Sequence, residues 1–333
     1  MIEGAPTESR WVRTEPRRGL PAHILNQIVG RAFPHRRLID ARPLESLRNA
    51  NFVLKLDSMA DRVVLRIYEH DPSLCQKELD LLRTIRNSVP VPEALHAEPG
   101  GLNEIPPFVL FRYIEGIEFR ELKRMENARS QAAYAVGQTL ARIGATTFDR
   151  SGWLGPGPAV LHPLLEGANP VPRFAELCLA SPNLRGRMEP ALRERTLALV
   201  WSYAAELAGL ENERCLIHGD FGKRNVIVRQ LAGSWTVAAV LDWEFALSGS
   251  PLADVGHFLR YERKSRPVAE PHFSEGYRHA GGRLPDGWRR LSRIVDSIAL
   301  CESLTHDELP GPIAAELVEL VSATIDDRDP QLA

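Results

Sequence analysis

Apolar residues follow two different spacings along this chain, and the change between them falls near residue 116. Over residues 22–33 they recur at helical intervals, at Ile24, Leu25, Ile28 and Val29. Runs rich in Val, Leu and Ile then predict strands at 37–41, 51–56 and 62–68, with residues 57–61 as a hairpin loop. A helix up to about residue 87 and an apolar strand over 108–114 complete this part.

Beyond residue 116 the helical spacing dominates. Helices are predicted at 129–147, 173–179, 190–210, 252–263, 273–280, 288–304 and 313–325, and short apolar strands at 215–217, 226–229 and 236–241. The chain is therefore expected to be an α+β protein of two lobes. An arm and helix occupy 1–36, a small lobe of antiparallel strands with one main helix occupies 37–116, and a larger, mostly helical lobe occupies 117–333. A crevice between two lobes is a common place for a ligand.

Composition and charge exclude several classes of protein. The 333 residues include 41 Lys and Arg against 43 Asp and Glu, a formal net charge of −2, and 44% are hydrophobic. These values are typical of globular domains and not of disordered, coiled-coil or collagen-like chains. The lack of a basic excess predicts no nucleic-acid partner. The lack of an apolar run of about 20 residues predicts no membrane span.

The cysteines and the first residues indicate a cytoplasmic protein. The four cysteines are far apart and form no C-x-x-C pair, which predicts buried, reduced thiols. The first eleven residues, MIEGAPTESRW, contain two glutamates and no apolar run, so no secretory signal is expected there.

The segment 215–261 contains the residues with the clearest chemistry. An apolar strand leads directly into His218-Gly219-Asp220, and Asn225 follows five residues after Asp220. An apolar hairpin then returns the chain and ends in Asp242. Two carboxylates and one amide oxygen are thus expected to meet at strand ends, where they suit Mg²⁺ and a phosphorylated substrate. With Asp220 facing a hydroxyl and the other two facing the metal, this arrangement fits phosphoryl transfer.

A purely structural interpretation of these residues is also available. Asp-Gly and Gly-Asp pairs are ordinary turn residues, and Asp242 could end a strand without any catalytic role. One such turn alone would favour that interpretation. Three matched elements, each following an apolar strand at the expected spacing, favour the catalytic one.

The pattern H-G-D-x-G-x-x-N, followed by an apolar hairpin and L-D-W, resembles the aminoglycoside phosphotransferase and choline kinase family. The resemblance extends over about residues 37–325 and is sharpest in 216–260. It implies a protein-kinase-like fold and transfer of the γ-phosphoryl group of a nucleoside triphosphate to a small-molecule hydroxyl. The nucleotide is expected to be ATP, with GTP possible, and the metal Mg²⁺.

The resemblance also implies roles for single residues. Asp220 would orient or deprotonate the acceptor hydroxyl, while Asn225 and Asp242 would hold Mg²⁺. His218 and Asp254 would support the catalytic loop, with Asp254 forming hydrogen bonds to it from the start of the next helix.

In the small lobe the same resemblance points to a cation that contacts phosphate and pairs with a helix glutamate. Arg66, in the strand R-V-V-L-R-I-Y, takes a position usually held by Lys, and Glu78 lies on the next helix. Arg can bind phosphate with two parallel hydrogen bonds. Lys55 is the alternative cation, and a weak surface ion pair is the alternative role for Arg66 and Glu78.

The loop before the second strand is expected to contact the triphosphate. It offers Ser46, Asn49 and Asn51 but no glycine, which makes a close approach of the backbone to phosphate harder. This departure from the family pattern leaves the orientation of the nucleotide open.

The segment F-V-L-F-R-Y-I-E-G resembles the family's linker between lobes. Adenine would lie against Phe111 and form hydrogen bonds with main-chain groups of Arg112 and Ile114. An apolar strand that ends at a glycine turn fits the same residues.

The acceptor is the least determined part. An acidic C-terminal region, including Glu302, Asp307, Glu308, Glu316, Glu319 and Asp326, would attract a polycation such as an aminoglycoside, although a solvated helix face is the commoner role of such charges. Lys223 is expected, ahead of Arg224, to neutralise the transferring phosphoryl group. Trp243 and Glu244 should lie near the reaction centre, with Trp243 in the core, and His257 and Tyr261 are expected to pack.

Two functions of different classes remain. The first is an ATP- and Mg²⁺-dependent phosphotransferase that acts on an aminoglycoside-like antibiotic, a sugar or an amino alcohol. The second is a nucleotide-binding pseudoenzyme or regulatory module on the same fold. A protein kinase is disfavoured, because the chain lacks H-R-D and A-P-E, and its D-F-G triplet at 220–222 lies inside the H-G-D loop and not at Asp242. The oligomeric state is left open.

Overall fold

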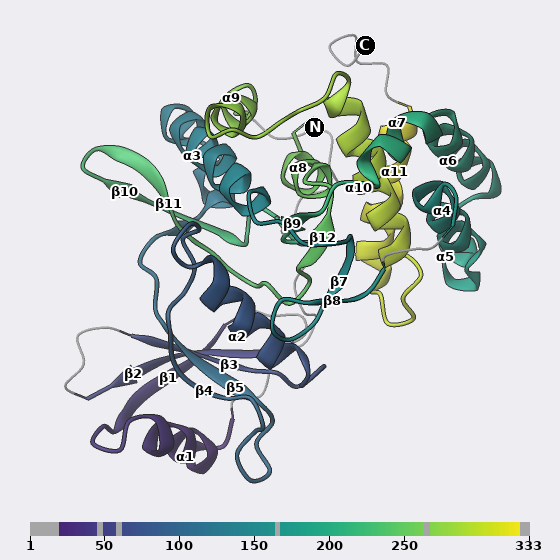
Figure 1. Ribbon diagram of the computed structural model, residues 1–333. Helices are drawn as coiled ribbons and strands as arrows, with labels where there is room; N and C mark the ends of the chain where they lie inside the picture. Colours follow the sequence, from purple (N-terminus) through teal and green to yellow (C-terminus); the bar gives the residue numbers. More distant parts are fainter. Residues whose placement is uncertain (1–19, 45–48, 58–61, 164–166, 263–266, 327–333) are drawn as a thin grey trace.

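Five antiparallel strands form the first sheet of the computed structural model, which describes residues 20–44, 49–57, 62–163, 167–262 and 267–326 (Figure 1). The strands are β1 (Leu38–Leu44), β2 (Ala50–Leu56), β3 (Val63–Ile67), β4 (Ala94–Glu98) and β5 (Phe108–Arg112), in the order β1-β2-β3-β5-β4. Because β1 is an edge strand, it tolerates Pro43, which has no N–H to donate.

A helix covers each face of this sheet. On one side α1 (Ala22–Ala32) packs Ile28 and Val29 against Phe52 and Leu65. On the other side α2 (Leu74–Ile85) packs its apolar residues together with Val109 in the core shared with the rest of the molecule. Each Ile or Phe side chain buried in this way contributes roughly 1.5–3 kcal/mol. The sheet is therefore a rigid platform for the residues on β3.

The chain leaves this sheet between Arg112 and residue 117 and at once joins a second one. Strand β6 (Ile117–Glu118) pairs with β10 (Val226–Leu231), which forms a hairpin with β11 (Ser234–Val240). A four-stranded sheet follows the order β8-β7-β12-β9, with β7 (Gly152–Leu154), β8 (Val160–His162), β9 (Cys215–Ile217) and β12 (Leu247–Gly249). The strands β9, β10, β11 and β12 all come from the segment 215–261 that the sequence marks as catalytic, so these two sheets fix its position.

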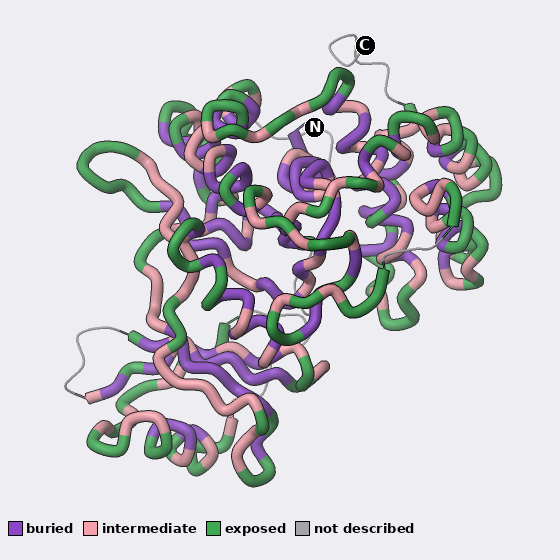
Figure 2. The backbone as a smooth tube through the Cα atoms, viewed as in Figure 1, coloured by how far each residue is buried: buried purple, intermediate pink, exposed green. Residues whose placement is uncertain are grey.

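Helices make up most of the remaining chain. One group surrounds the two small sheets and shares their core: η2 (Phe119–Leu122), α3 (Glu126–Gly144), α7 (Ala204–Leu210), α8 (Leu252–Leu259), α9 (His272–His279) and α10 (Trp288–Ser303). The others build a second apolar cluster with the end of α10: α4 (Pro170–Ala180), α5 (Pro182–Arg187), α6 (Pro190–Ser202) and α11 (Gly311–Ile325). Buried residues lie toward the inside of the helical part and exposed residues lie at its rim (Figure 2).

The structure corrects several predicted elements. The single helix predicted over 190–210 is wrong, because Tyr203, at φ −108° and ψ 18°, interrupts it between α6 and α7. Strands β4, β6, β7, β8 and β12 were not predicted, and β6 has only two residues. Three of them have only three residues, which is too short to show an alternating pattern. The predicted arm up to residue 19 and most of the predicted hairpin loop, residues 58–61, lie outside the described residues.

Candidate active site

The loop after β9 carries Asp220 and depends on Gly219. Gly219 has a φ of +80°, and a Cβ atom there would lie 2.5 Å from the carbonyl oxygen of Phe245. Any other residue would therefore need both a strained backbone and a displaced neighbour. The glycine lets the chain turn sharply from the buried strand into the loop.

Asp254, at the start of α8, holds this loop with both of its carboxylate oxygens. Its Oδ2 accepts the N–H of His218 at 2.7 Å, and its Oδ1 accepts the N–H of Gly219 at 3.0 Å. Burial raises the pKa of the Asp254 carboxyl to about 7, although both N–H donors act in the opposite direction. Both oxygens thus fix the backbone immediately before Asp220.

The ring of His218 links the loop to the end of the hairpin. Its Nε2 lies 2.8 Å from the carbonyl oxygen of Leu241, and its Nδ1 accepts the N–H of Asp220 at 3.2 Å. Burial lowers the pKa of His218 to about 4, so the ring is neutral and Nε2 carries the proton. The imidazole also packs on Trp243, with ring centroids 4.6 Å apart.

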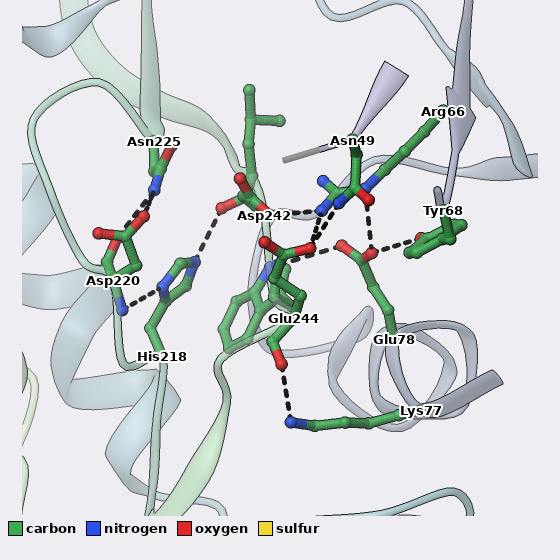
Figure 3. Close-up of polar contacts among 12 residues, drawn as sticks. Asn49, Arg66, Tyr68, Lys77, Glu78, His218, Asp220, Asn225, Asp242 and Glu244 are labelled. Carbon is green, nitrogen blue, oxygen red and sulfur yellow. Dashed lines mark hydrogen bonds and ion pairs between the residues drawn. The ribbon is translucent and has the colours of Figure 1, made fainter. Parts of the chain in front are cut away.

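Asn225 contacts Asp220 directly. Its Nδ2 donates to the Oδ2 and to the main-chain oxygen of Asp220, both at 2.8 Å (Figure 3). Burial, and next the charge of Asp242, raise the pKa of the Asp220 carboxyl to about 7. A third of the Asp220 side chain (34%) still reaches solvent, so the carboxylate lies in a recess that is open on one side.

The hairpin places Asp242 beside this pair. Val226 pairs with Val240, and the N–H of Leu241 donates to the carbonyl of Asn225 at 2.8 Å. Asp242 then adopts a left-handed conformation with a φ of 67°, which is rare for a residue with a Cβ atom and recurs at functional sites. The turn directs its carboxylate toward the small-lobe residues (Figure 3).

Arg66 brings the positive charge from β3. Its Nη2 donates to the Oδ1 of Asp242 at 2.6 Å and to the Oε2 of Glu244 at 2.8 Å. Its Nε lies 3.5 Å from the Oε2 of Glu78, a distance of ion pairing without a well-formed hydrogen bond. The Arg66 and Glu78 side chains are only 9% and 3% exposed, so the alternative of a surface ion pair is wrong. Lys55, the alternative cation, lies exposed on β2.

Two more contacts join α2 to the segment after the hairpin. Glu78 accepts the main-chain N–H of Trp243 at 3.1 Å and also binds the hydroxyl of Tyr68. Lys77 donates to the carbonyl oxygen of Glu244 at 2.8 Å, and burial lowers its pKa to about 8. The small lobe is therefore fastened to residues 242–244 by side chains from both β3 and α2.

The residues that were predicted to bind the nucleotide differ in where the structure places them. Asn49 is buried, and its Nδ2 donates to Glu244 at 2.5 Å, so it belongs to the charged cluster. Ser46 lies outside the described residues. Phe111 is buried at the end of β5. The N–H of Arg112 already donates to the carbonyl of Glu93 at 2.9 Å, so an adenine contact through that N–H is excluded in this arrangement.

The expected role of Lys223 needs correction. The lysine is buried, and its Nζ lies 2.8 Å from Glu262, with Arg129 3.7 Å from the same carboxylate oxygen. This pairing turns the ammonium group into the helical lobe and away from a phosphoryl group at Asp220. Lys223 therefore anchors the catalytic loop to the segment after α8.

In the described part of the acidic C-terminal region, three carboxylates already contact other side chains. Glu316 is buried and accepts the hydroxyl of Tyr261 at 2.7 Å. Glu302 contacts His306, and Asp326 contacts Arg195. The buried Glu316 therefore belongs neither to an open carboxylate wall nor to a solvated helix face, and its contact supports the packing role of Tyr261.

Glu244 was expected near the reaction centre and lies there, whereas His257 was expected only to pack and instead contacts Asp220. Glu244 is 4% exposed and contacts Arg66. His257 lies with its Nε2 3.3 Å from the Oδ1 of Asp220, and burial lowers its pKa well below the usual value, so it is neutral. Its position three residues after Asp254, on the same helix face, was the available signal.

The donor set suits a hard cation that also binds phosphate. Both hydrogens of the Asn225 amide group point to Asp220, which leaves its Oδ1 for a metal, and Asp242 offers the oxygen that Arg66 does not take. Within the described ranges, no group of three or more His, Cys, Asp or Glu side chains is arranged to hold a metal ion. One carboxylate, one amide oxygen and substrate phosphates are the usual Mg²⁺ set, so the residues fit.

Other features of the surface lie apart from this site. A hollow of about 540 Å³ between the start of α3 and the β10–β11 hairpin is lined by Met125, Glu126 and Trp235 among others, and contains none of the predicted site residues. None of the helices in the described residues combines the length and the apolar character that a bilayer crossing requires.

Solved structures of known phosphotransferases share this fold. Aminoglycoside 2′-phosphotransferase-IIIa in complex with GDP aligns with a TM-score of 0.68 and 15% identity, over 92% of this chain and 99% of that one. A thermostable mutant of APH(4)-Ia, in ternary complex with ADP and hygromycin B, aligns with a TM-score of 0.64 and 19% identity, over 90% and 97%. The macrolide 2′-phosphotransferase MphH from Brachybacterium faecium aligns with a TM-score of 0.61 and 18% identity, over 92% and 99%.

Curated relatives match over shorter stretches. Acyl-CoA dehydrogenase family member 11 of Pongo abelii is 48% identical over 102 residues, 30% of this chain and 12% of that protein. Acyl-CoA dehydrogenase family member 10 of Mus musculus is 27% identical over 191 residues, 55% of this chain and 16% of that protein. This chain therefore corresponds to a small part of each relative.

The model of the phosphotransferase enzyme family (APH) matches residues 40–294, well over half of the chain. The match includes the catalytic loop, the hairpin and the small-lobe strands described above. The protein is thus a member of the APH phosphotransferase enzyme family, a small-molecule kinase.

Proposed function

We propose that this kinase transfers the γ-phosphoryl group of ATP, with Mg²⁺, to a hydroxyl group of a small molecule. The observation that carries the proposal is the joint placement of Asp220, Asn225 and Asp242 opposite Arg66. Phosphoryl transfer needs this combination of a base for the hydroxyl, oxygen ligands for a cation and a positive charge near the phosphates.

Asp220 is the proposed base. Its carboxylate is held on Oδ2 by Asn225 and keeps one side open to solvent, where an acceptor hydroxyl can approach. With a pKa of about 7 it accepts a proton far more readily than an ordinary aspartate would. The proton of the hydroxyl passes to Oδ1 of Asp220, the oxygen that Asn225 does not bind, as the new oxygen–phosphorus bond forms. The bond from the γ-phosphorus to the bridging oxygen of ATP breaks in the same transfer, and ADP leaves.

The remaining roles concern the nucleotide. Asn225 and Asp242 would hold Mg²⁺, which when bound offsets the charge of the phosphates. Arg66 supplies a fixed positive charge beside them, and Asn49 stands on the same side of the site. The neighbouring structures contain ADP and GDP in two different phosphotransferases, so both ATP and GTP should be tested as donors.

The acceptor class follows from two separate hints. One structural neighbour binds hygromycin B, which puts aminoglycosides in the first group of acceptors to test. The curated relatives bear the name acyl-CoA dehydrogenase, which puts hydroxylated acyl-CoA compounds in a second group. Sugars and amino alcohols complete the panel.

The test is an ADP-release assay across this panel, with product identified by mass spectrometry. Replacing Asp220 with Ala should lower turnover by about a thousandfold or more, because the base is lost. Nucleotide affinity, measured by calorimetry, should change less than about twofold. The exposed Asp40→Asn is the matched control and should retain full activity.

Two results would count against the proposal. Retained turnover in Asp220→Ala would remove Asp220 from its role as base. Metal-independent nucleotide binding without phosphorylation of any acceptor would favour the alternative, a nucleotide-binding regulatory module.

A further inference from the structure

A single guanidinium nitrogen serves two carboxylates in this site. The Nη2 of Arg66 donates to Asp242 at 2.6 Å and to Glu244 at 2.8 Å. The two acids differ in their surroundings, because the Asp242 side chain is 33% exposed and the Glu244 side chain only 4%. Asp242 can therefore be reached from solvent, whereas Glu244 lies behind it.

Glu244 is fixed on the small-lobe side by further contacts. The same oxygen that accepts from Arg66 also accepts from the Nδ2 of Asn49 at 2.5 Å, and the main-chain oxygen of Glu244 accepts from Lys77 at 2.8 Å. Three donors from three small-lobe elements thus hold one residue (Figure 3).

Arg66 binds only Oδ1 of Asp242, but this charge-assisted hydrogen bond keeps the carboxylate turned toward the guanidinium and weakens its attraction for a cation at the other oxygen. If Asp242 turned toward a divalent ion, Arg66 would need another anion, because a buried charge without a partner is strongly unfavourable. Glu244 is placed to be that anion, since it already binds the same nitrogen. Glu78, whose closest oxygen is 3.5 Å from the Nε of Arg66, is a weaker substitute.

We propose that Glu244 is a positioning residue that retains Arg66 and so releases Asp242 for the divalent cation. The inference rests on the proposed Mg²⁺-dependent function and assigns Glu244 a role through Arg66, without contact to the metal. It predicts that Glu244 controls metal affinity although its own carboxylate faces the small-lobe donors.

The first experiment measures Mn²⁺ binding in the presence of a non-hydrolysable ATP analogue, by the electron paramagnetic resonance signal of free Mn²⁺. Glu244→Gln keeps the size and one acceptor oxygen but removes the charge, so Arg66 should hold Asp242 more tightly. The Mn²⁺ dissociation constant should rise about tenfold, as is usual when a group behind a metal ligand is altered. Glu316→Gln, which neutralises a buried glutamate elsewhere, should leave it unchanged. An unchanged constant in Glu244→Gln would overturn the inference.

The second experiment separates an action through Arg66 from direct ligation. In an Arg66→Gln background, adding Glu244→Gln should alter the Mn²⁺ constant less than about twofold, because residues that act through one another are not additive. A full tenfold effect in that background would show that Glu244 acts without Arg66.

A third measurement needs no change at Arg66 and applies if Arg66→Gln fails to fold. Wild-type protein labelled with ¹³C at the glutamate carboxyl carbons, loaded with Mn²⁺ and the analogue, should show no strong ¹³C coupling in electron–nuclear double resonance. A contact coupling that disappears in Glu244→Gln would make Glu244 a ligand and overturn the inference. If the wild type bound no Mn²⁺ with nucleotide, the proposed function would fail first, and this inference with it.

Discussion

Asp220 shows how the environment of one residue sets its chemistry. Three groups surround its carboxyl group: Asn225 donates to it, His257 lies 3.3 Å away as a neutral ring, and Asp242 adds a negative charge nearby. The sequence predicted that Asp220 and Asn225 lie close together, because both residues flank one short loop. It did not assign a site role to His257, since that contact depends on how α8 crosses beneath the loop.

The pH dependence of catalysis should report this carboxyl group. A base must be deprotonated, so kcat/KM should rise about tenfold between pH 6 and pH 7.5 with an apparent pKa of about 7. The measurement is a pH–rate profile at saturating Mg²⁺. The residual activity of Asp220→Asn should be flat over the same interval. A wild-type profile that is flat between pH 6 and pH 8 would contradict the assignment.

The same pKa shift should make Asp220 lower the stability of the folded protein as the pH rises. The pKa of Asp220 is raised in the folded state, from 3.8 to about 7, so its ionised form disfavours folding above pH 7 and has no such effect below about pH 4. Asp220→Asn should therefore raise the melting temperature by about 2–4 °C at pH 8, a modest effect because a third of the side chain is exposed. The gain should disappear toward pH 4. An equal shift at both pH values, measured by scanning calorimetry, would rule out this origin.

At the scale of elements, the sequence predicted helices and strands that contain many apolar positions. It did not predict local breaks or contacts between residues far apart in the chain. The strands β2 and β3 and the helices α2, α9 and α10 appear close to the predicted ranges, because many buried positions define each of them. The break between α6 and α7 depends on the backbone at Tyr203, and no Gly or Pro marks it. The pairing of Lys223 with Glu262 joins residues 39 positions apart, so only the folded chain reveals it.

That pair should stabilise the catalytic loop. Lys223→Met would leave Glu262 buried with only part of its positive surroundings, and the free energy of unfolding should fall by about 2–4 kcal/mol. The double variant Lys223→Met/Glu262→Gln should recover only part of this loss, because it also removes the carboxylate that lies 3.7 Å from the buried Arg129. Urea unfolding followed by circular dichroism measures both.

A surface pair gives the comparison. Arg62→Met, which breaks the exposed contact with Glu115, should cost less than about 1 kcal/mol. If Lys223→Met cost no more than Arg62→Met, the buried pair would not be what holds the loop.

At the scale of the whole molecule, the site exists only because two parts of the chain meet. Arg66, Glu78 and Lys77 come from the first sheet and α2, while Asp242 and Glu244 follow the β10–β11 hairpin. The two-lobed organisation was predictable from the change of apolar period near residue 116. The acceptor region was not, because the helical pattern there reports burial and does not identify the side chains that face a substrate.

Lys77 offers a test of this junction. Lys77→Met removes the hydrogen bond to the carbonyl of Glu244 and leaves that carbonyl without this donor, so stability should fall by about 1–3 kcal/mol. Nucleotide affinity should fall several-fold, because residues 242–244 would no longer be fastened to α2. Calorimetric titration with ATP and Mg²⁺ checks the second effect. The exposed Lys123→Met is the control, and equal affinities in the two variants would contradict the role of Lys77.

The pairing of β6 with β10 has a mechanical consequence. Residues 117 and 118, which directly follow the crossing from the first sheet, are hydrogen-bonded to Val228 and Ile227, only a few positions after Asn225. A hinge rotation of the small lobe cannot be absorbed by slack chain there. Such a rotation would pull on β10, the strand that begins directly after Asn225, and would therefore also shift the proposed metal ligand.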